Sequence, residues 1–370
     1  MRQETIAIHA GNATDNGNHA AIQPITLSTT FVRQDGNGDF VYTRASNPNR
    51  ASLENLLAKL EGGADACAFS SGNAAGMAVF QALEPGSHVV LPDDMYHGLR
   101  NGILTVLGGV IDAVFVDMTD LEQVRGAIGS RTKLIWIETP SNPLLKISDI
   151  RAICRLAAER NIMVGCDSTF GTPVLQQPLA LGADIVMHST TKYLSGHSDV
   201  LGGALVTRTD NAFWQRIRSI QELSGAVPAP FDCYMAVRGI KTLPYRMRGH
   251  VANATRLAAF LHEHPKVEQV YYPGLPHHPG FSIAEKQMQG AGGMLSFLVR
   301  GESEEAMKLV RLVRVFTHAT SLGGVESLME QRASVEGPDT KTPPNLIRVS
   351  VGLEHIDDLI ADLSQALDRI

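Results

Sequence analysis

Two side chains of opposite charge follow consecutive strand-like segments, and together they could bind an aldehyde that carries a pyridine ring. Asp167 directly follows the apolar run 162–166, and Lys192 lies shortly after the run 184–187. A lysine amine can form an imine with an aldehyde, and a carboxylate can keep a pyridine nitrogen protonated, which makes the ring an electron sink. The pair therefore indicates pyridoxal-phosphate (PLP) chemistry, with a salt bridge at the edge of a sheet as the alternative.

A turn of small residues could bind the phosphate of such a cofactor. Ser70-Ser71-Gly72-Asn73 lies between the strand-like run 66–69 and the helical stretch 74–83. The free N–H groups and the dipole of a helix N-terminus attract anions, although a purely structural turn explains the same residues. Tyr96 follows another strand-like run and could stack on a planar ring, or it could be a half-buried tyrosine at the edge of the sheet.

The elements that must position these residues follow an alternating pattern of strands and helices. We predict strands at 66–69, 88–91, 113–116, 133–137, 162–166 and 184–187, with helices such as 74–83 and 150–159 between most of them. Continuous apolar strands that alternate with helices predict an α/β fold with a mostly parallel sheet flanked by helices. Ligands of such sheets sit beyond the carboxyl ends of the strands, where the residues above fall. Segment 202–207 could return as an antiparallel strand.

The chain divides into three predicted regions. Residues 1–46 are polar without a sustained period and predict an extended arm, and residues 47–243 hold the cofactor-binding domain. Leucines at 53, 56, 57 and 60 predict an amphipathic helix that begins near Ser52. Residues 244–370 predict a smaller α+β domain, with helices at 249–264 and 303–313, a strand at 295–299 and a final helix from Ile356 to Leu367.

Composition narrows the possible partners and location. The formal charge of −6 gives no sign of nucleic-acid binding or of a basic membrane patch. The apolar runs are too short to span a bilayer, and no signal peptide is evident at Met1. Four scattered cysteines suit buried thiols in a reducing compartment. We therefore expect a cytoplasmic protein.

Motifs in the same order along nearly the whole chain carry a family resemblance. They are Tyr42-Thr43-Arg44, Ser70-Ser71-Gly72, Glu138-Thr139-Pro140-Ser141-Asn142-Pro143, Asp167-Ser168-Thr169-Phe170, the segment 188–199 around Lys192, Ser321-Leu322-Gly323-Gly324, and Arg348-Val349-Ser350-Val351-Gly352. This set resembles the Cys/Met-metabolism family of PLP enzymes, which includes cystathionine γ-synthases, cystathionine β- and γ-lyases and methionine γ-lyases. The resemblance implies the aspartate aminotransferase-like fold, called fold type I.

The resemblance also implies roles around the cofactor ring and the substrate. Lys192 would carry PLP as an imine and then move protons between substrate carbons, while Asp167 would pair with the pyridine nitrogen. Tyr96 would stack on the ring and act as acid or base near the leaving group, and Asn142 would contact the ring hydroxyl. Arg348 would bind the substrate carboxylate with its two-pronged guanidinium, with Ser321 and Thr320 close to the substrate.

Further implied roles concern the phosphate and the subunits. Gly72, Asn73, Ser189 and Thr191 would hold the phosphate, and Tyr42 and Arg44 would reach the phosphate of a neighbouring subunit's cofactor. A homotetramer built as a dimer of dimers, with active sites shared between subunits, would follow from this arrangement. Taken without the family, Arg348 could equally form a structural ion pair.

The chain departs from its relatives where specificity is set. Thr320 replaces the glutamate of cystathionine-handling members and the valine of methionine γ-lyases. Gly98 replaces the cysteine of γ-lyases, and His97 replaces a usual glycine. Gln331-Arg332 stands where the family has His-Pro. We interpret His97 and Arg332 as solvated loop residues, with a position at the rim of the site as the alternative.

The implied reaction is γ-elimination from a γ-substituted L-amino acid such as cystathionine or methionine, which releases a 2-oxo acid and ammonia. The alternative is γ-replacement, in which a thiol takes the place of the departed group, as in a cystathionine γ-synthase or an O-acylhomoserine sulfhydrylase. The sequence does not separate the two, because they share every step up to that branch.

Other classes of function are weaker. Ser189-Thr190-Thr191-Lys192 matches the S-x-x-K motif of serine hydrolases, but the motif should open a helix and here it follows a strand. An inactive scaffold is disfavoured because Lys192, Asp167 and Arg348 are all present. His277-His278 lies in a loop without spaced carboxylates or thiols, so we expect no metal site.

Overall fold

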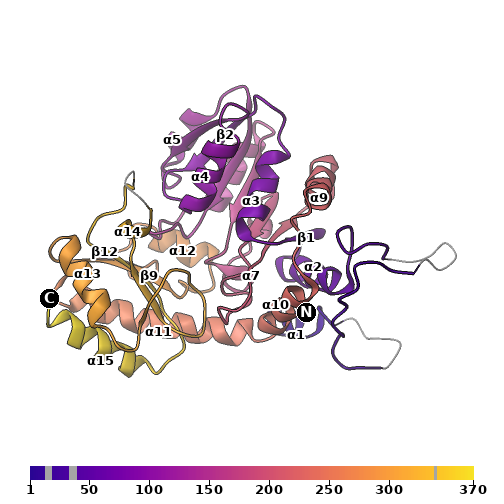
Figure 1. Cartoon of the computed structure of the whole chain (residues 1–370). Coiled ribbons are helices and arrows are strands. Elements are labelled where there is room, and N and C mark those ends of the chain that lie inside the picture. The colour runs from indigo at the N-terminus through magenta and orange to yellow at the C-terminus, as the bar shows by residue number, and fades with distance from the viewer. Residues whose placement is uncertain (13–18, 33–39, 337–339) are drawn as a thin grey trace.

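The computed structural model describes residues 1–12, 19–32, 40–336 and 340–370. Its larger sheet has seven strands in the order β1-β7-β6-β5-β4-β2-β3 (Figure 1). The strands are β1 (Asp65–Phe69), β2 (His88–Pro92), β3 (Asp112–Val116), β4 (Thr132–Glu138), β5 (Met163–Asp167), β6 (Ile185–His188) and β7 (Gly203–Thr207). Strands β2 to β6 pair in parallel, and β7 is antiparallel to both of its neighbours. The predicted mostly parallel sheet and its antiparallel return are confirmed.

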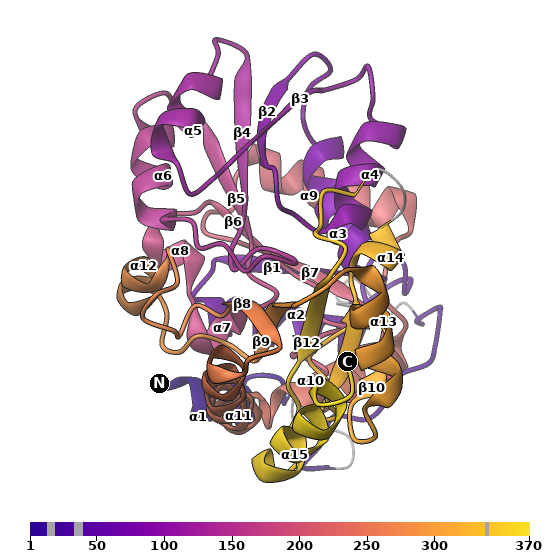
Figure 2. The same ribbon diagram turned by 90° about the vertical axis from the view of Figure 1, so that its left-hand side faces the viewer.

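Helices cover both faces of this sheet (Figure 2). One face carries α3 (Gly72–Gln81), α4 (His97–Val106) and α9 (Ala212–Ser224), and the other carries α5 (Leu121–Ala127) and α6 (Ile150–Ala158). Alternate side chains of β4 pack in different cores: Trp136 packs on the α3 side, whereas Ile135 and Ile137 pack on the α6 side. Because both faces are buried, these strands are continuous apolar runs in the sequence. Short helices α7 (Thr172–Leu175) and α8 (Pro178–Leu181) connect β5 to β6.

A second, five-stranded sheet has the order β10-β11-β12-β9-β8. Its strands are β8 (Val267–Tyr271), β9 (Met294–Val299), β10 (Thr317–His318), β11 (Leu328–Gln331) and β12 (Leu346–Ser350). The remaining helices are α10 (Pro230–Ile240), which packs against α2, and α11 (Leu243–Glu263), α12 (Phe281–Gln287), α13 (Ser303–Leu312), α14 (Ala333–Glu336) and α15 (Ile356–Leu367). Helix α11 begins earlier than predicted because Pro244 occupies its first turn, where proline's fixed φ suits a helix and its missing N–H costs nothing.

The start of the chain differs from the predicted extended arm. Residues Gln3–His9 form helix α1, which packs against α2 (Pro48–Glu61) and α11. Ala7 is fully buried there, with Ile6 and Ala10 packed against the same core. So short a helix is stabilised by tertiary packing rather than by local propensity, which a polar N-terminal sequence conceals. Residues 19–32 and 40–46 form no helix or named strand and extend from the body (Figure 1); residues 13–18 and 33–39 of the predicted arm lie outside the described residues.

The two sheets fall within the predicted regions 47–243 and 244–370, and the boundaries between those regions stay predictions. None of the helices in the described ranges combines the length and the apolar character that crossing a bilayer requires.

Candidate active site

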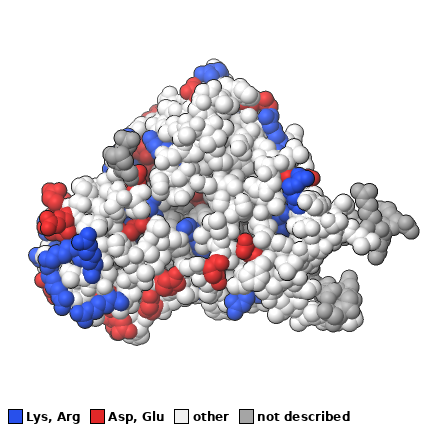
Figure 3. Space-filling model, viewed as in Figure 1, with Lys and Arg blue, Asp and Glu red and all other residues white. Residues whose placement is uncertain are grey.

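A cavity of about 370 Å³ lies where carboxyl ends of the large sheet meet residues of the smaller sheet. It brings together these residues of the predicted site: Gly72, Asn73, Tyr96, Asn142, Asp167, Ser189, Thr191, Lys192, Thr320, Ser321 and Arg348. Figure 3 shows the hollow near the centre of this face of the molecule, between the two lobes. Residues from strand ends far apart in the sequence therefore share one enclosure.

Lys192 lies in the turn that follows β6 and reaches across the cavity. Its Nζ donates a hydrogen bond to Ser321 Oγ at 2.6 Å. Burial, followed by the positive charge of Arg348, lowers the pKa of Lys192 to about 8. A buried lysine with a lowered pKa holds a sizeable neutral fraction near neutral pH, and only the neutral amine is a nucleophile. Ser321 itself has a left-handed backbone, with φ of 84°.

Asp167 ends β5, and Thr169 fixes its orientation. The Thr169 N–H and hydroxyl both donate to Asp167 Oδ1, at 2.9 and 2.6 Å. The same hydroxyl oxygen accepts from the N–H of Ser189 at 2.9 Å. Asp167 Oδ2 makes no hydrogen bond within the described part of the chain, while the residue lines the cavity. A carboxylate oxygen placed in this way can accept a hydrogen bond from a protonated ring nitrogen.

The N-terminus of α3 forms a cradle on the side of Ser189. Ser71 caps the helix, since its Oγ accepts from the N–H of Ala74 at 3.1 Å. A Cβ at Gly72 would lie 2.9 Å from Ser189 Cβ, so only glycine permits this close approach. The cradle therefore offers helix N–H groups and the Ser189 hydroxyl to an anion. An amine, a free carboxylate oxygen and an anion cradle in one cavity fit PLP.

Thr191 lines the same cavity, but its hydroxyl also serves the loop that precedes β7. Its Oγ1 donates to the carbonyl of Gly202 at 3.1 Å and accepts from the Gly202 N–H at 3.0 Å. Segment 189–192 forms turns and opens no helix, which removes the structural support that an S-x-x-K hydrolase would need.

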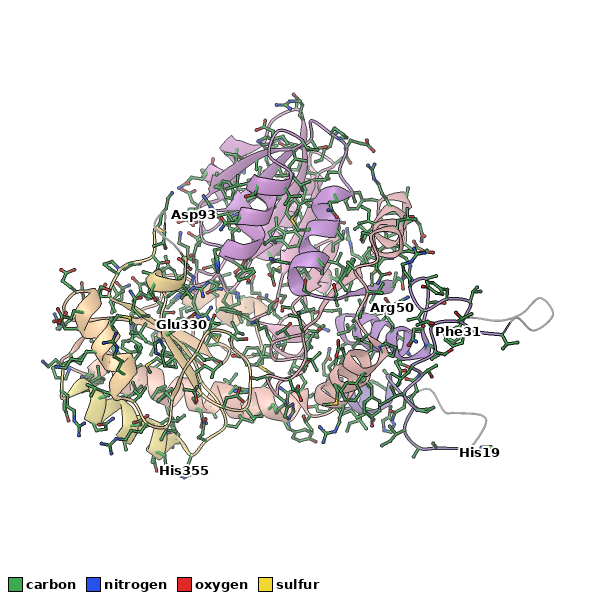
Figure 4. All side chains as sticks on the ribbon, in the orientation of Figure 1. His19, Phe31, Arg50, Asp93, Glu330 and His355 are labelled. Atoms are coloured by element: carbon green, nitrogen blue, oxygen red, sulfur yellow. The ribbon has the colours of Figure 1, made fainter. Side chains whose placement is uncertain are left out.

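Arg348 projects from β12 with its guanidinium held on several sides. Nη1 donates to Asn142 Oδ1 at 3.0 Å, and Nη2 donates to the carbonyl of Ser321 at 3.1 Å. Nη2 also lies 2.5 Å from Glu330 Oε1. Glu330 belongs to β11 of the smaller sheet and is labelled in Figure 4. Burial lowers the pKa of Arg348 to about 10, so the group stays cationic at neutral pH and can bind a carboxylate.

Glu138 lines the cavity, and no role was predicted for it. It ends β4 in register with Asp167 on β5, and its Oε2 accepts the backbone N–H of Tyr96 at 2.8 Å. Burial, and then the charge of Asp167, raises the pKa of Glu138 well above its usual range. The sequence signal was present, because Glu138 occupies the same strand-end position as Asp167.

Tyr96 stands at the start of α4 with 39% of its surface exposed. Its ring leans on Gly98, where an added Cβ would lie 2.7 Å from two ring carbons.

The interpretation of Arg332 as a solvated loop residue is wrong: its side chain is only 2% exposed, and it contacts His97 on the cavity wall. Carboxylates on β11 and α14 pair with Arg332 and so permit its burial.

Tyr42 and Arg44 do not line the cavity of their own chain. Tyr42 is 46% exposed, and Arg44 Nη1 donates to the carbonyl of Glu222 at 3.0 Å. Their predicted contact with a neighbouring subunit stays a prediction.

Comparison with known proteins extends the likeness to the whole chain. The family model described as Cys/Met metabolism PLP-dependent enzyme matches residues 4–368. The chain is 49% identical over 377 residues to a cystathionine γ-synthase of Mycobacterium leprae, covering 98% of this chain and 96% of the relative. It is 42% identical over 382 residues to a cystathionine γ-lyase of Dictyostelium discoideum, covering 99% and 97%. The crystal structure of metB from Corynebacterium glutamicum matches with a TM-score of 0.97 at 42% identity, covering 100% of this chain and 98% of that one. The chain belongs to the Cys/Met-metabolism family of PLP-dependent enzymes.

Proposed function

We propose that this enzyme removes the γ-substituent of an L-amino acid such as cystathionine or methionine by γ-elimination, with release of a 2-oxo acid and ammonia. One observation carries the proposal: Lys192, Asp167 and Arg348 line a single cavity that ends in the Gly72 cradle. When bound, PLP supplies an electron sink that makes the α-proton of an attached amino acid acidic.

Side chains of the protein would bind the substrate and move its protons. Arg348 would bind the α-carboxylate and so orient Cα toward Lys192. The Lys192 amine, with its lowered pKa, would accept the α-proton and later return a proton to a substrate carbon. Tyr96 would donate a proton near the leaving group, and Asp167 would keep the proton on the ring nitrogen. The Gly72 and Asn73 N–H groups, with Ser189 and Thr191, would hold the phosphate.

A second candidate is γ-replacement, in which a thiol adds after the γ-substituent has left. The identity of 49% to a cystathionine γ-synthase, against 42% to a cystathionine γ-lyase, favours it. Both reactions need the same residues up to departure of the γ-substituent, so the product decides between them.

A panel of γ-substituted amino acids separates the two reactions. The purified holoenzyme is incubated with cystathionine, methionine, homocysteine, O-acyl homoserines and oxyguanidino analogues, with and without cysteine. Release of 2-oxo acid without cysteine supports γ-elimination, whereas a product formed only when cysteine is present contradicts it and supports γ-replacement. A Lys192→Ala variant should release neither product and should lose the near-visible absorption of the bound cofactor.

We further propose a cytoplasmic homotetramer in which each arm completes a neighbour's site. The support is that Tyr42 is exposed and lies outside its own cavity, on a segment that extends from the body.

A further inference from the structure

His97 and Arg332 meet on the cavity wall although 235 positions separate them. Arg332 Nη2 lies 3.0 Å from His97 Nδ1. A guanidinium has only donors, so His97 Nδ1 must accept this hydrogen bond and carries no proton. The ring proton of the neutral imidazole therefore lies on Nε2. Burial, and then the charge of Arg332, lowers the pKa of His97, which favours this neutral form.

Arg332 positions His97 through a guanidinium that is held at each of its three nitrogens. Its Nε donates to Glu336 Oε1 at 2.8 Å and its Nη1 to Glu330 Oε1 at 2.9 Å. With Nη2 on His97, every nitrogen of the guanidinium is engaged, and two carboxylates balance its charge. The hydroxyls of Thr340 and Thr342 each donate to Glu336 Oε2 at 2.6 Å, which fixes this side of the assembly.

The same ion pairs fix the position of His97 relative to Arg348, the proposed binding site of the substrate carboxylate. Glu330 Oε1 contacts Arg332 on one side and Arg348 on the other. His97 also lies edge-on to Tyr96, with ring centroids 5.1 Å apart. His97 therefore belongs, with Tyr96, to the part of the cavity wall that faces the side chain of a substrate held at Arg348 and near Lys192. His97 Nε2 makes no hydrogen bond within the described ranges, and the residue lines the cavity.

We propose that His97, held by Arg332, determines specificity by presenting Nε2–H to a hydrogen-bond acceptor in the γ-substituent. The substrate class is then amino acids whose leaving group carries a carboxylate or ester oxygen, in preference to apolar thioethers. The inference rests on the proposed loss of a γ-substituent but holds for either elimination or replacement. An apolar substrate would cover this donor without supplying an acceptor, and the unpaired donor disfavours its binding.

The test measures kcat/KM for release of succinate, acetate or methanethiol from O-succinyl-L-homoserine, O-acetyl-L-homoserine and L-methionine. His97→Phe keeps a ring and removes the donor. It should lower kcat/KM about ten- to a hundredfold for the succinyl substrate and less than about threefold for methionine. His97→Gln, whose amide is again a donor, should restore part of the difference. His262→Phe, a matched change at an exposed histidine of α11, should change neither value.

Arg332→Met tests the positioning role separately. It should reduce the same succinyl-to-methionine preference, and nitrogen-15 NMR of labelled histidine should show the His97 ring losing its single Nε2–H tautomer. An equal effect of His97→Phe on all three substrates, or an unchanged tautomer in Arg332→Met, would overturn the inference while leaving the proposed function intact. A wild-type holoenzyme that releases no leaving group from any of the three, with or without cysteine, refutes this inference, whereas the proposed function is refuted only if cystathionine and the rest of the panel also fail.

Discussion

Burial and the charge of Arg348 lower the pKa of Lys192, and this pKa should control how fast the apo-protein binds PLP. Only the neutral amine can attack an aldehyde, and its fraction rises with pH through a pKa of about 8. The rate at which the apo-protein gains the near-visible absorption of bound PLP should therefore rise with pH and level off above about pH 8, far below the range of ordinary lysines.

Replacing Arg348 tests whether its positive charge lowers the pKa of Lys192. Arg348→Met takes away a cation that disfavours protonated Lys192, so the midpoint should move to higher pH. Arg248→Met, a change at an exposed arginine of α11, should leave the midpoint in place, and free Nα-acetyl-lysine reports the titration of PLP itself. A downward shift in Arg348→Met would refute this account of the lysine.

Asp167→Asn replaces a carboxylate with an amide of similar size at the end of β5. An amide cannot balance a protonated ring nitrogen, so kcat for loss of the γ-substituent should fall by about a hundredfold or more. Thr169→Val removes one hydrogen bond to Asp167 Oδ1 and the acceptor of the Ser189 N–H but keeps the bond from its own backbone N–H, so its effect should be only about five- to tenfold. Equal losses in the two variants would contradict the role assigned to Asp167.

At the scale of elements, the first turn of α4 positions the ring of Tyr96. A Cβ at Gly98 would lie within 2.8 Å of the ring and hydroxyl of Tyr96, so Gly98→Ala must displace that ring. We expect kcat/KM to fall about tenfold and the absorption of the bound cofactor to shift, while the thermal unfolding temperature changes little.

Gly126→Ala is the matched control for this prediction. Gly126 is also a helical glycine, in α5, and an added Cβ there has no atom within 4 Å among the described residues. This change should leave kcat/KM unaltered and raise the free energy of unfolding by up to about 1 kcal/mol. A Gly98→Ala enzyme with wild-type kcat/KM would show that the position of the Tyr96 ring does not matter.

At the scale of the whole molecule, a shared active site predicts complementation between inactive variants. Arg44→Ala damages the arm and Lys192→Ala damages the pocket, so a mixed pair of subunits still contains one intact site. After unfolding and refolding together, random pairing should restore about a quarter of wild-type activity. Activity and subunit composition are measured on the same sample. If each arm served its own chain, the mixture would stay as inactive as its parts.

Sequence by itself determined the fold class and the core of the site. Strands buried on both faces must be continuous apolar runs, and their polar terminal residues must meet at one edge of a parallel sheet. That rule predicts that Asp167 and Lys192 share one cavity, and the ordered motifs indicate the family. Helix α1 was missed because Ala7 and Ile6 stabilise it only through distant partners in α2 and α11.

Only the tertiary structure decided which charged residues meet across the interface of the two sheets. Arg332 and His97 have no local pattern that distinguishes them from loop residues, since their partners lie on other elements. The raised pKa of Glu138 likewise depends on burial and on its register opposite Asp167. Periodicity reports which side of an element is buried, whereas contacts between distant side chains depend on three-dimensional packing that no local spacing encodes.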